Sequence, residues 1–350
     1  MSLLSGALCG IFQELVKVPG PSGFEKKIRE KILEITKPYC DEQIVDPLGN
    51  VICLVRGRNE EKRILLTAHM DTIGLIVTRI TNEGFIKFAR IGGVNPQTLI
   101  GTPVKIIGKK EVEGIISYKP YHLLKTDEKQ KIPDIRNLYI DCGVSSKDEL
   151  KGIVSVGDPI AFCTSLRKLG KHRISSAGLD NRTGCVILIE LLKRLRDKEM
   201  PCNIYFSFTV QEEIGVMAAQ SVAFRVKPNL AIILDTTHAT DIPPLSGYHD
   251  IKLGFGPAIA SPPSTKEDVF NFLIKVAHDE KIPYQIEPEL APRGTEAGVV
   301  QLVRSGIKTA LVSIPLRYMH STNEIIDLRD VENAIDLLTH VLLRKEILQF

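Results

Sequence analysis

Four apolar stretches, each long enough to form one buried strand, are followed within a few residues by histidine or by acidic residues. They are residues 63–68 before His69 and Asp71, 203–210 before Glu212 and Glu213, 229–234 before Asp235, and 309–314 before His320. Stretches this rich in β-branched and aromatic residues predict core strands. Because open α/β sheets bind ligands outside the carboxyl ends of their strands, we expect these polar residues to meet in one cleft.

The pair Glu212 and Glu213 is the most informative part of this pattern. Adjacent carboxylates repel each other, and neither gains by burial unless a cation or a proton lies nearby. At the end of a core strand, the pair therefore indicates a metal ion that one carboxylate binds, while the other acts as a general base. On these grounds either glutamate can take either role.

Asp180 adds a further carboxylate, in the loop 178–184 that precedes a helical stretch over 185–196. Two metal ions about 3.5–4 Å apart need a shared carboxylate ligand. Asp180 is the natural bridge because it belongs to a rigid junction between loop and helix. His69 supplies one ligand, and Asp71 can hold the other nitrogen of its ring. Imidazole and carboxylate ligands suit zinc, cobalt or manganese.

The length of 350 residues exceeds that of one usual compact domain. Between about residues 73 and 165, short strands alternate with glycine turns, which predicts a small β-barrel or sandwich inserted into an α/β domain. From residue 180 onward, helices alternate with buried strands. We therefore expect an α/β main domain over residues 1–72 and 166–350 and a β-rich insertion over residues 73–165. The insertion contributes none of the candidate ligands and leaves the main domain beside the cleft.

Composition argues against several classes of partner. The formal net charge of +3 is small and dispersed, so we expect no nucleic-acid partner. No stretch reaches the ~20 apolar residues needed to span a bilayer, so we expect no membrane partner. The seven cysteines are scattered and include no CxxC pair. We therefore expect free thiols and a cytoplasmic location.

Five motifs resemble those of the glutamyl aminopeptidase and tetrahedral aminopeptidase family. These are co-catalytic dimetal exopeptidases, and members have often been labelled endoglucanases. The motifs are AHMD at 68–71, GLDNRTG at 178–184, TVQEEIG at 209–215, DTTHA at 235–239 and RYMHS at 317–321. The resemblance covers essentially the whole chain in order, including a β-rich insertion directly after the His-x-Asp motif.

This resemblance implies a mixed-sheet α/β exopeptidase domain with an inserted PDZ-like β-barrel that serves dimerisation. The metal ligands that it implies are His69 and Asp235 for one ion, Glu213 and His320 for the other, and Asp180 as the bridge. Glu212 is then the general base, and Asp71 is the orienting acid. The resemblance further implies peptide substrates, two divalent ions per subunit, with zinc or cobalt expected, and assembly of identical subunits into a hollow tetrahedral dodecamer.

Three positions depart from the family pattern. Asn181 stands where many members have Asp, Thr72 where a Glu often follows His-Met-Asp, and Glu296 where Gly-Thr-Asp-Ala is usual. We expect the segment 294–297 to lie on the substrate side of the cleft, where the longer carboxylate of Glu296 changes the side-chain preference. With Arg293, Glu296 could then set a charge preference for the first residue of the substrate. None of the three departures alters an inferred ligand or the base.

Three other functions compete with this interpretation. A glycosidase needs two acids about 5–10 Å apart on facing walls and no histidine ligands, and the absence of Trp removes the commonest platform for sugars. A dimetal deacylase or carboxypeptidase would use the same ions, and a comparison of free and N-acetylated amino-acid p-nitroanilides separates it from an aminopeptidase. A non-catalytic assembly subunit is disfavoured by the intact ligand set.

Overall fold

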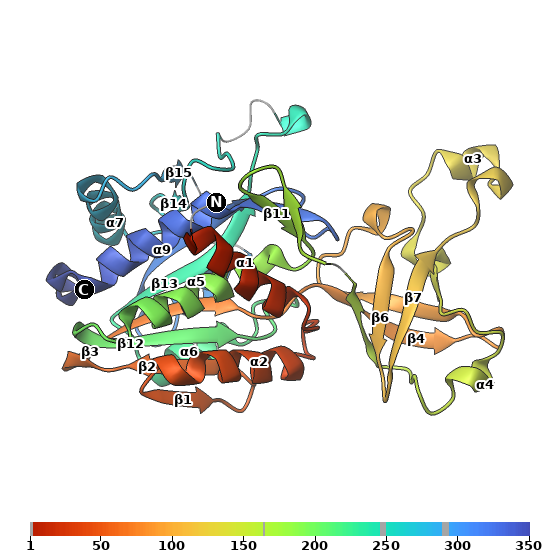
Figure 1. Cartoon of the computed structure of the whole chain (residues 1–350), viewed down its shortest axis with the longest axis horizontal. Coiled ribbons are helices and arrows are strands. Elements are labelled where there is room, and N and C mark those ends of the chain that lie inside the picture. Colours follow the sequence, from red (N-terminus) through yellow and green to blue (C-terminus); the bar gives the residue numbers. More distant parts are fainter. Residues whose placement is uncertain (1–2, 164, 246–249, 289–293) are drawn as a thin grey trace.

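The computed structural model describes residues 3–163, 165–245, 250–288 and 294–350. A large α/β body and a smaller β-barrel lie side by side and are joined by the chain segments on either side of the barrel (Figure 1). The predicted fold class, an α/β domain that carries a small inserted β-barrel, is confirmed. Within the described residues, no helix combines the length and the apolar character needed to cross a bilayer.

The α/β body is built on a mixed sheet of eight strands. The strands are β1 (Glu42–Val45), β2 (Val51–Val55), β3 (Gly57–His69), β12 (Met200–Thr209), β13 (Leu230–His238), β14 (Ala258–Ala260), β15 (Gln285–Glu287) and β16 (Lys308–Leu316). Their order in the sheet is β1-β2-β12-β3-β13-β16-β14-β15. The central strands β12, β3, β13 and β16 contain the four apolar stretches and run parallel to one another. Their carboxyl ends therefore lie at one edge.

Helices cover both faces of this sheet. The longer ones are α1 (Leu3–Val16), α2 (Lys26–Thr36), α5 (Leu179–Leu195), α6 (Ala219–Val226), α7 (Glu267–Asp279), α8 (Glu296–Val300) and α9 (Leu328–Leu343). Residues of α1, α2, α5, α7 and α9 share one apolar core, and residues of α6 and α8 share the core on the opposite face. Strand β3 serves both cores in alternation, since Leu66 belongs to the first and Leu65 to the second.

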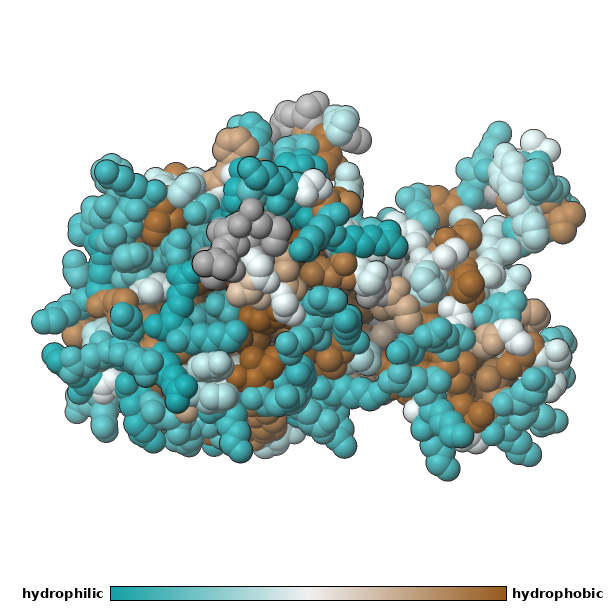
Figure 2. Space-filling model, in the orientation of Figure 1, coloured by the Kyte–Doolittle hydropathy of each residue, from teal (hydrophilic) through white to brown (hydrophobic). Residues whose placement is uncertain are grey.

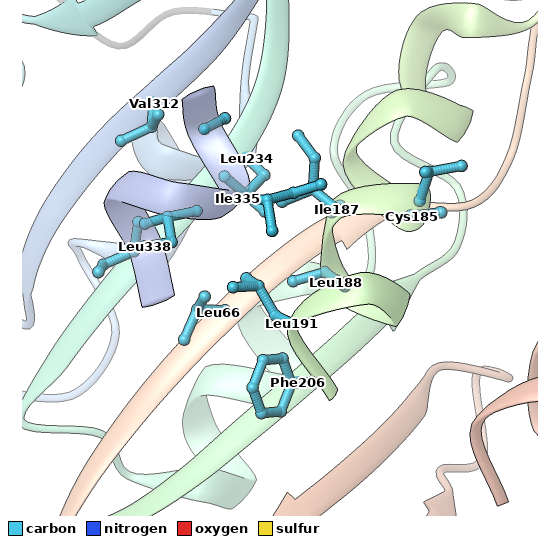
Figure 3. Packing of buried hydrophobic residues seen from close by; sticks show 14 of the residues in the cluster. Leu66, Cys185, Ile187, Leu188, Leu191, Phe206, Leu234, Val312, Ile335 and Leu338 are labelled. Carbon is cyan, nitrogen blue, oxygen red and sulfur yellow. The ribbon is translucent and has the colours of Figure 1, made fainter. Parts of the chain in front are cut away.

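The first core is formed where α5 and α9 lie on the central strands (Figure 3). Leu188 and Leu191 of α5 lie near Leu66 of β3 and Phe206 of β12, and all four side chains are buried. Leucines at helical spacing predict this buried side of α5. The helix begins earlier than the predicted residue 185, although Asp180 and Asn181 inside its first turn have non-helical backbone angles.

The barrel has six antiparallel strands and a separate apolar core. They are β4 (Gly74–Ile80), β5 (Ile86–Ile91), β6 (Pro103–Ile107), β7 (Glu111–Ser117), β8 (Tyr139–Asp141) and β9 (Pro159–Phe162), closed in the order β4-β5-β8-β7-β6-β9. Two short helices, α3 (Thr126–Lys129) and α4 (Lys147–Leu150), lie in its connections. The chain returns through β10 (Arg167–Leu169) and β11 (Arg173–Ser176), which form a small sheet with β17 (Glu324–Asp327).

Candidate metal centre

The parallel strands bring the candidate ligands to one height at the edge of the sheet. His69 ends β3 and is paired in register with Thr209, the last residue of β12. Asp235 of β13 lies at the same level, because Ile233 pairs with Thr67 two residues earlier. Glu212 and Glu213 follow β12, and His320 follows β16. These residues, which are distant in the sequence, therefore meet in one cleft.

Asp180 lies between two groups of potential ligands. Its Oδ1 is 3.4 Å from Nε2 of His69, and its Oδ2 is 3.4 Å from Nε2 of His320. Asp235 completes the first group, with its Oδ1 3.8 Å from His69 Nε2. Glu213 completes the second, with its Oε2 3.3 Å from His320 Nε2. In each group the three ligand atoms lie within 4.8 Å of one another, close enough to hold one metal ion.

Glu212 lies beside the first group without belonging to it. Its Oε2 is 4.0 Å from His69 Nε2, and the residue is 9% exposed. The cleft, about 330 Å³ in volume, is lined by His69, Gly93, Asp180, Glu212, Glu213, Gly215, Val216, Asp235, Thr236, Gly294, Thr295, Met319 and His320. Glu212 therefore offers a carboxylate to the cleft that no ligand group requires.

Asp71 is fully buried beneath the two glutamates and holds them in place. Its Oδ1 accepts the N–H of Glu212 at 3.2 Å, and its Oδ2 accepts the N–H of Glu213 at 3.1 Å. Nδ1 of His69 hydrogen-bonds to the backbone carbonyl of Asp71 at 3.2 Å and lies 3.6 Å from the Asp71 carboxylate. Burial alone would raise the pKa of Asp71, but the hydrogen bond and charge of His69, together with both backbone N–H groups, lower it. Asp71 therefore orients a ligand, its neighbouring base and an imidazole at once.

The electrostatics of the cleft fit a divalent cation. Burial, followed by the charges of nearby carboxylates, raises the pKa of both Glu212 and Glu213 to about 8, and burial raises that of Asp235 well above its usual range. The hydrogen bond to Asp180 is the main reason why the pKa of His320 rises to about 9. So many carboxylates in one buried place repel one another unless protons or metal ions neutralise them.

Two buried oxygens point to the same conclusion. Oδ1 of Asp180 and Oε1 of Glu213 have no hydrogen-bond partner within the described residues. Buried polar atoms of this kind are rare and need an explanation. Cations bound in the two groups supply one, because their bonds to Asp180 in the first group and to Glu213 in the second replace the missing hydrogen bonds. The nitrogen and oxygen donors of both groups suit zinc and related divalent ions.

Comparison with known proteins identifies the family. The model of the M42 glutamyl aminopeptidase family matches residues 49–337. The chain belongs to this family. Lysyl aminopeptidase of Pyrococcus furiosus is 36% identical over 93% of this chain and 94% of that protein.

Solved structures agree with the assignment to the M42 family. The TET aminopeptidase of Thaumarchaeota archaeon SCGC AB-539-E09 has a TM-score of 0.91, 34% identity, and coverage of 97% of each chain. The TET1 peptidase of Pyrococcus horikoshii has a TM-score of 0.86, 33% identity, and coverage of 96% of this chain and 99% of that one. The predicted family and the predicted class, a peptidase hydrolase, are confirmed: this M42 chain is an aminopeptidase of a metal-dependent family.

The segment around Glu296 reaches the cleft as expected, through Gly294 and Thr295, but the Glu296 carboxylate does not line it. Glu296 opens α8 and is 1% exposed. Its carboxylate accepts the hydroxyl of Thr67 on β3 at 2.7 Å and that of Thr209 on β12. It is not among the described residues that line the cleft, although its neighbours Gly294 and Thr295 are. Glu296 therefore ties α8 to the strands that carry His69 and Glu212, and Arg293, its expected companion, lies outside the described residues.

The other two departures also have structural roles. The amide of Asn181 donates to the carbonyl of Leu234 at 2.8 Å, and its oxygen accepts the N–H of Gly184 at 2.8 Å. Asn181 thus fixes the start of α5 against the end of β13, beside Asp235. The hydroxyl of Thr72 donates to the carbonyl of Gly20 at 3.4 Å.

Glu324, at the start of β17, is a residue of the centre that the sequence did not reveal. It is 1% exposed. Its Oε2 accepts the N–H of Asp180 at 3.1 Å, and its Oε1 accepts the N–H of His320 at 2.9 Å. Glu324 therefore connects the shared carboxylate to a ligand of the second group, as Asp71 connects Glu212 to Glu213. Its position four residues after His320 was the only signal in the sequence.

Proposed function

We propose that this chain is a dimetal aminopeptidase that removes N-terminal residues from peptides, with Glu212 as the general base. The observation that carries the proposal is the position of Asp180, whose two oxygens face two separate groups of ligand atoms. One metal ion would be held by His69 and Asp235, the other by Glu213 and His320, and Asp180 would bridge them. The donor atoms favour zinc or cobalt.

Each residue of the cleft has a separate role in the proposed reaction. Two divalent ions, when bound, would acidify the attacking water and polarise the carbonyl of the scissile peptide bond. Glu212 is placed to take the proton from that water and to pass it to the nitrogen of the leaving peptide as the C–N bond breaks. Asp71 fixes the direction of Glu212 through its backbone N–H.

A direct experiment measures metal and activity on the same preparation. We expect two equivalents of zinc or cobalt per chain and hydrolysis of amino-acid p-nitroanilides that carry a free amine. Glu212→Gln should keep both metal equivalents and lose about 10²–10⁴-fold in turnover. A protein that binds no transition metal, even after incubation with zinc or cobalt, contradicts the dimetal mechanism. Preference for N-acetylated substrates would favour a deacylase, and cleavage of a soluble β-glucan would favour a glycosidase.

We further propose that the domain over residues 73–165 serves assembly of identical subunits, up to a tetrahedral dodecamer. The Pyrococcus horikoshii TET1 peptidase assembles into a tetrahedron or an octahedral shell. The barrel side of this molecule exposes apolar side chains amid a mostly hydrophilic surface (Figure 2). In the same domain, the side chains of Ile115, Tyr121, Leu123 and Val156 are each more than half exposed. A stable interface should bury more than about 1,000 Å².

Light scattering tests this assembly. A monomer that is fully active on both short peptides and folded proteins would contradict an enclosed chamber and would leave the metal chemistry intact. We also propose a cytoplasmic location. It is supported by the cysteines, all seven of which are free thiols, as expected in a reducing compartment.

A further inference from the structure

The inserted barrel reaches the metal centre through two glycines that follow β5. Gly93 lines the cleft together with the ligands. A Cβ atom added to Gly93 would lie 2.6 Å from Nδ1 and 3.0 Å from Cε1 of the His320 ring. A Cβ on Gly92 would lie 3.2 Å from the carbonyl oxygen and 3.3 Å from the Cβ of Glu213. The backbone of the barrel therefore packs directly against two candidate ligands.

Both contacts fall on the second ligand group. His320 and Glu213 are two of its three members, whereas His69 and Asp235 of the first group are held in the strands of the α/β body. His69 is almost completely buried, but the side chain of His320 is 32% exposed. His320 also lies outside regular structure, with a left-handed φ of +60°. Its ring is therefore oriented less by its own backbone than by what touches it.

The neighbours of His320 hold different parts of the residue. Glu324 binds its backbone N–H, which fixes the position of the main chain. Asp180 and Glu213 approach Nε2, the nitrogen that faces the proposed metal. Gly93 lies against the edge of the ring formed by Nδ1 and Cε1. Of these contacts, that of Gly93 limits how far the ring can turn away from the metal.

We propose that Gly93 is a positioning residue, through which the inserted barrel sets the orientation of His320 and so the affinity of the second metal group. The inference rests on the proposed dimetal function. Any side chain at this position would bring Cβ closer than the about 3.0 Å that real contacts keep, so the ring or the loop would have to move. Metal–ligand distances tolerate only about 0.2 Å, so such a movement weakens binding. The barrel is thus part of the metal centre although it supplies no ligand.

This arrangement links metal binding to the position of the barrel. Whatever holds the barrel in place also holds His320 in the geometry that binds metal, and metal bound at the second group stabilises that same position. The linkage concerns the second group alone, because the first group lacks a ligand that Gly92 or Gly93 contacts closely. Changes in the barrel should therefore alter the metal affinity of the second group and leave that of the first group unchanged.

Gly93→Ala tests the proposal, because its φ lies outside the left-handed region and alanine adds volume without backbone strain. Zinc and cobalt titrations, followed by metal analysis after dialysis, should show the second equivalent weakened at least tenfold and the first unchanged. Cobalt absorption spectra should report the loss of one site. Gly10→Ala is the matched control, because that exposed glycine of α1 has no other atom within 4 Å of the added Cβ.

A double variant separates positioning from misfolding. In a protein that already carries His320→Ala, the imidazole ring next to Gly93 is gone. Adding Gly93→Ala to that protein should therefore change neither the metal affinity of the first group nor the melting temperature. Two equivalents bound by Gly93→Ala with wild-type affinity would overturn the proposal. So would an equal loss of stability in both backgrounds, since the barrel would then be damaged independently of His320. Failure of the wild-type protein to bind two ions would instead contradict the dimetal function.

Discussion

Glu212→Gln should stabilise the metal-free protein at alkaline pH while it abolishes most activity. Burial, followed by the charges of Glu213, Asp180 and Glu296, raises the pKa of Glu212 from 4.5 to about 8, although the charge of His69 opposes the change. A carboxyl group whose pKa is raised in the folded state binds its proton more tightly there than in the unfolded chain. Its contribution to stability is complete below pH 4.5 and is lost as the pH rises through 8.

The size of this effect follows from the two pKa values. The interval between 4.5 and about 8, at ~1.4 kcal/mol per pH unit, sets an upper limit of about 5 kcal/mol on the change in the free energy of unfolding, because Glu212 and Glu213 titrate together. Whole domains are stable by only about 5–15 kcal/mol. Glutamine has nearly the same shape and carries no charge. The two metal-free proteins should therefore be similarly stable at pH 4.5–5, and the variant should be more stable by several kcal/mol at pH 8.5.

Urea unfolding of EDTA-treated protein at pH 5, 7 and 8.5 measures this difference. Asp180 and Asp71 do not contribute within this range, because their lowered pKa values place their effects below about pH 4. Glu34→Gln is the control, since the Glu34 side chain is 70% exposed and the substitution should leave the pH dependence unchanged. A metal-free Glu212→Gln protein that is no more stable than wild type at pH 8.5 would refute the electrostatic account of the centre.

Three further predictions follow from the surroundings of the site. Glu324→Ala should lower the affinity for metal about 10–100-fold, measured by competition with a chelator, because two backbone N–H groups lose the carboxylate that orients Asp180 and His320. Glu296→Asp should leave the ranking of acidic, basic and aliphatic first residues unchanged but lower the melting temperature, since the shorter side chain cannot reach both threonines; a changed ranking would show that Glu296 does select the side chain. Leu188→Ala should cost about 2–5 kcal/mol in urea unfolding, because Leu188 of α5 is fully buried against the central strands.

The candidate ligands could be predicted because their signal is local. An apolar stretch and the polar residue that ends it are neighbours in the sequence, and parallel pairing then brings such ends to one edge. His69 and Asp235 lie at the same level because the register of β3 and β13 places them there. The expected strand 229–234 extends to His238 in β13, but that difference moves no ligand.

The residues that were not predicted contact partners that lie far from them in the sequence. Glu324 binds the N–H of Asp180, which lies 144 residues earlier, and Gly93 contacts a ring that lies far later in the chain. No periodicity relates such residues. The segment that contains Glu296 does reach the cleft, since Gly294 and Thr295 line it, but the sequence could not give the direction of the Glu296 side chain. The start of α8 turns its carboxylate away from the cleft and toward Thr67 and Thr209.

The adjacent glutamates can face different ligand groups because the strand geometry of β12 ends just before them. Gln211 has a left-handed φ of +58°, so the alternation of β12 does not continue into the pair. Glu212 faces His69 of the first ligand group, and Glu213 faces His320 of the second. Asp71 binds both of their N–H groups. The separation between the proposed proton acceptor and the nearest ligand is therefore set by one peptide unit and one buried carboxylate. A pair contributed by two distant elements would depend on their packing, and a small shift of either would move the base relative to the metal.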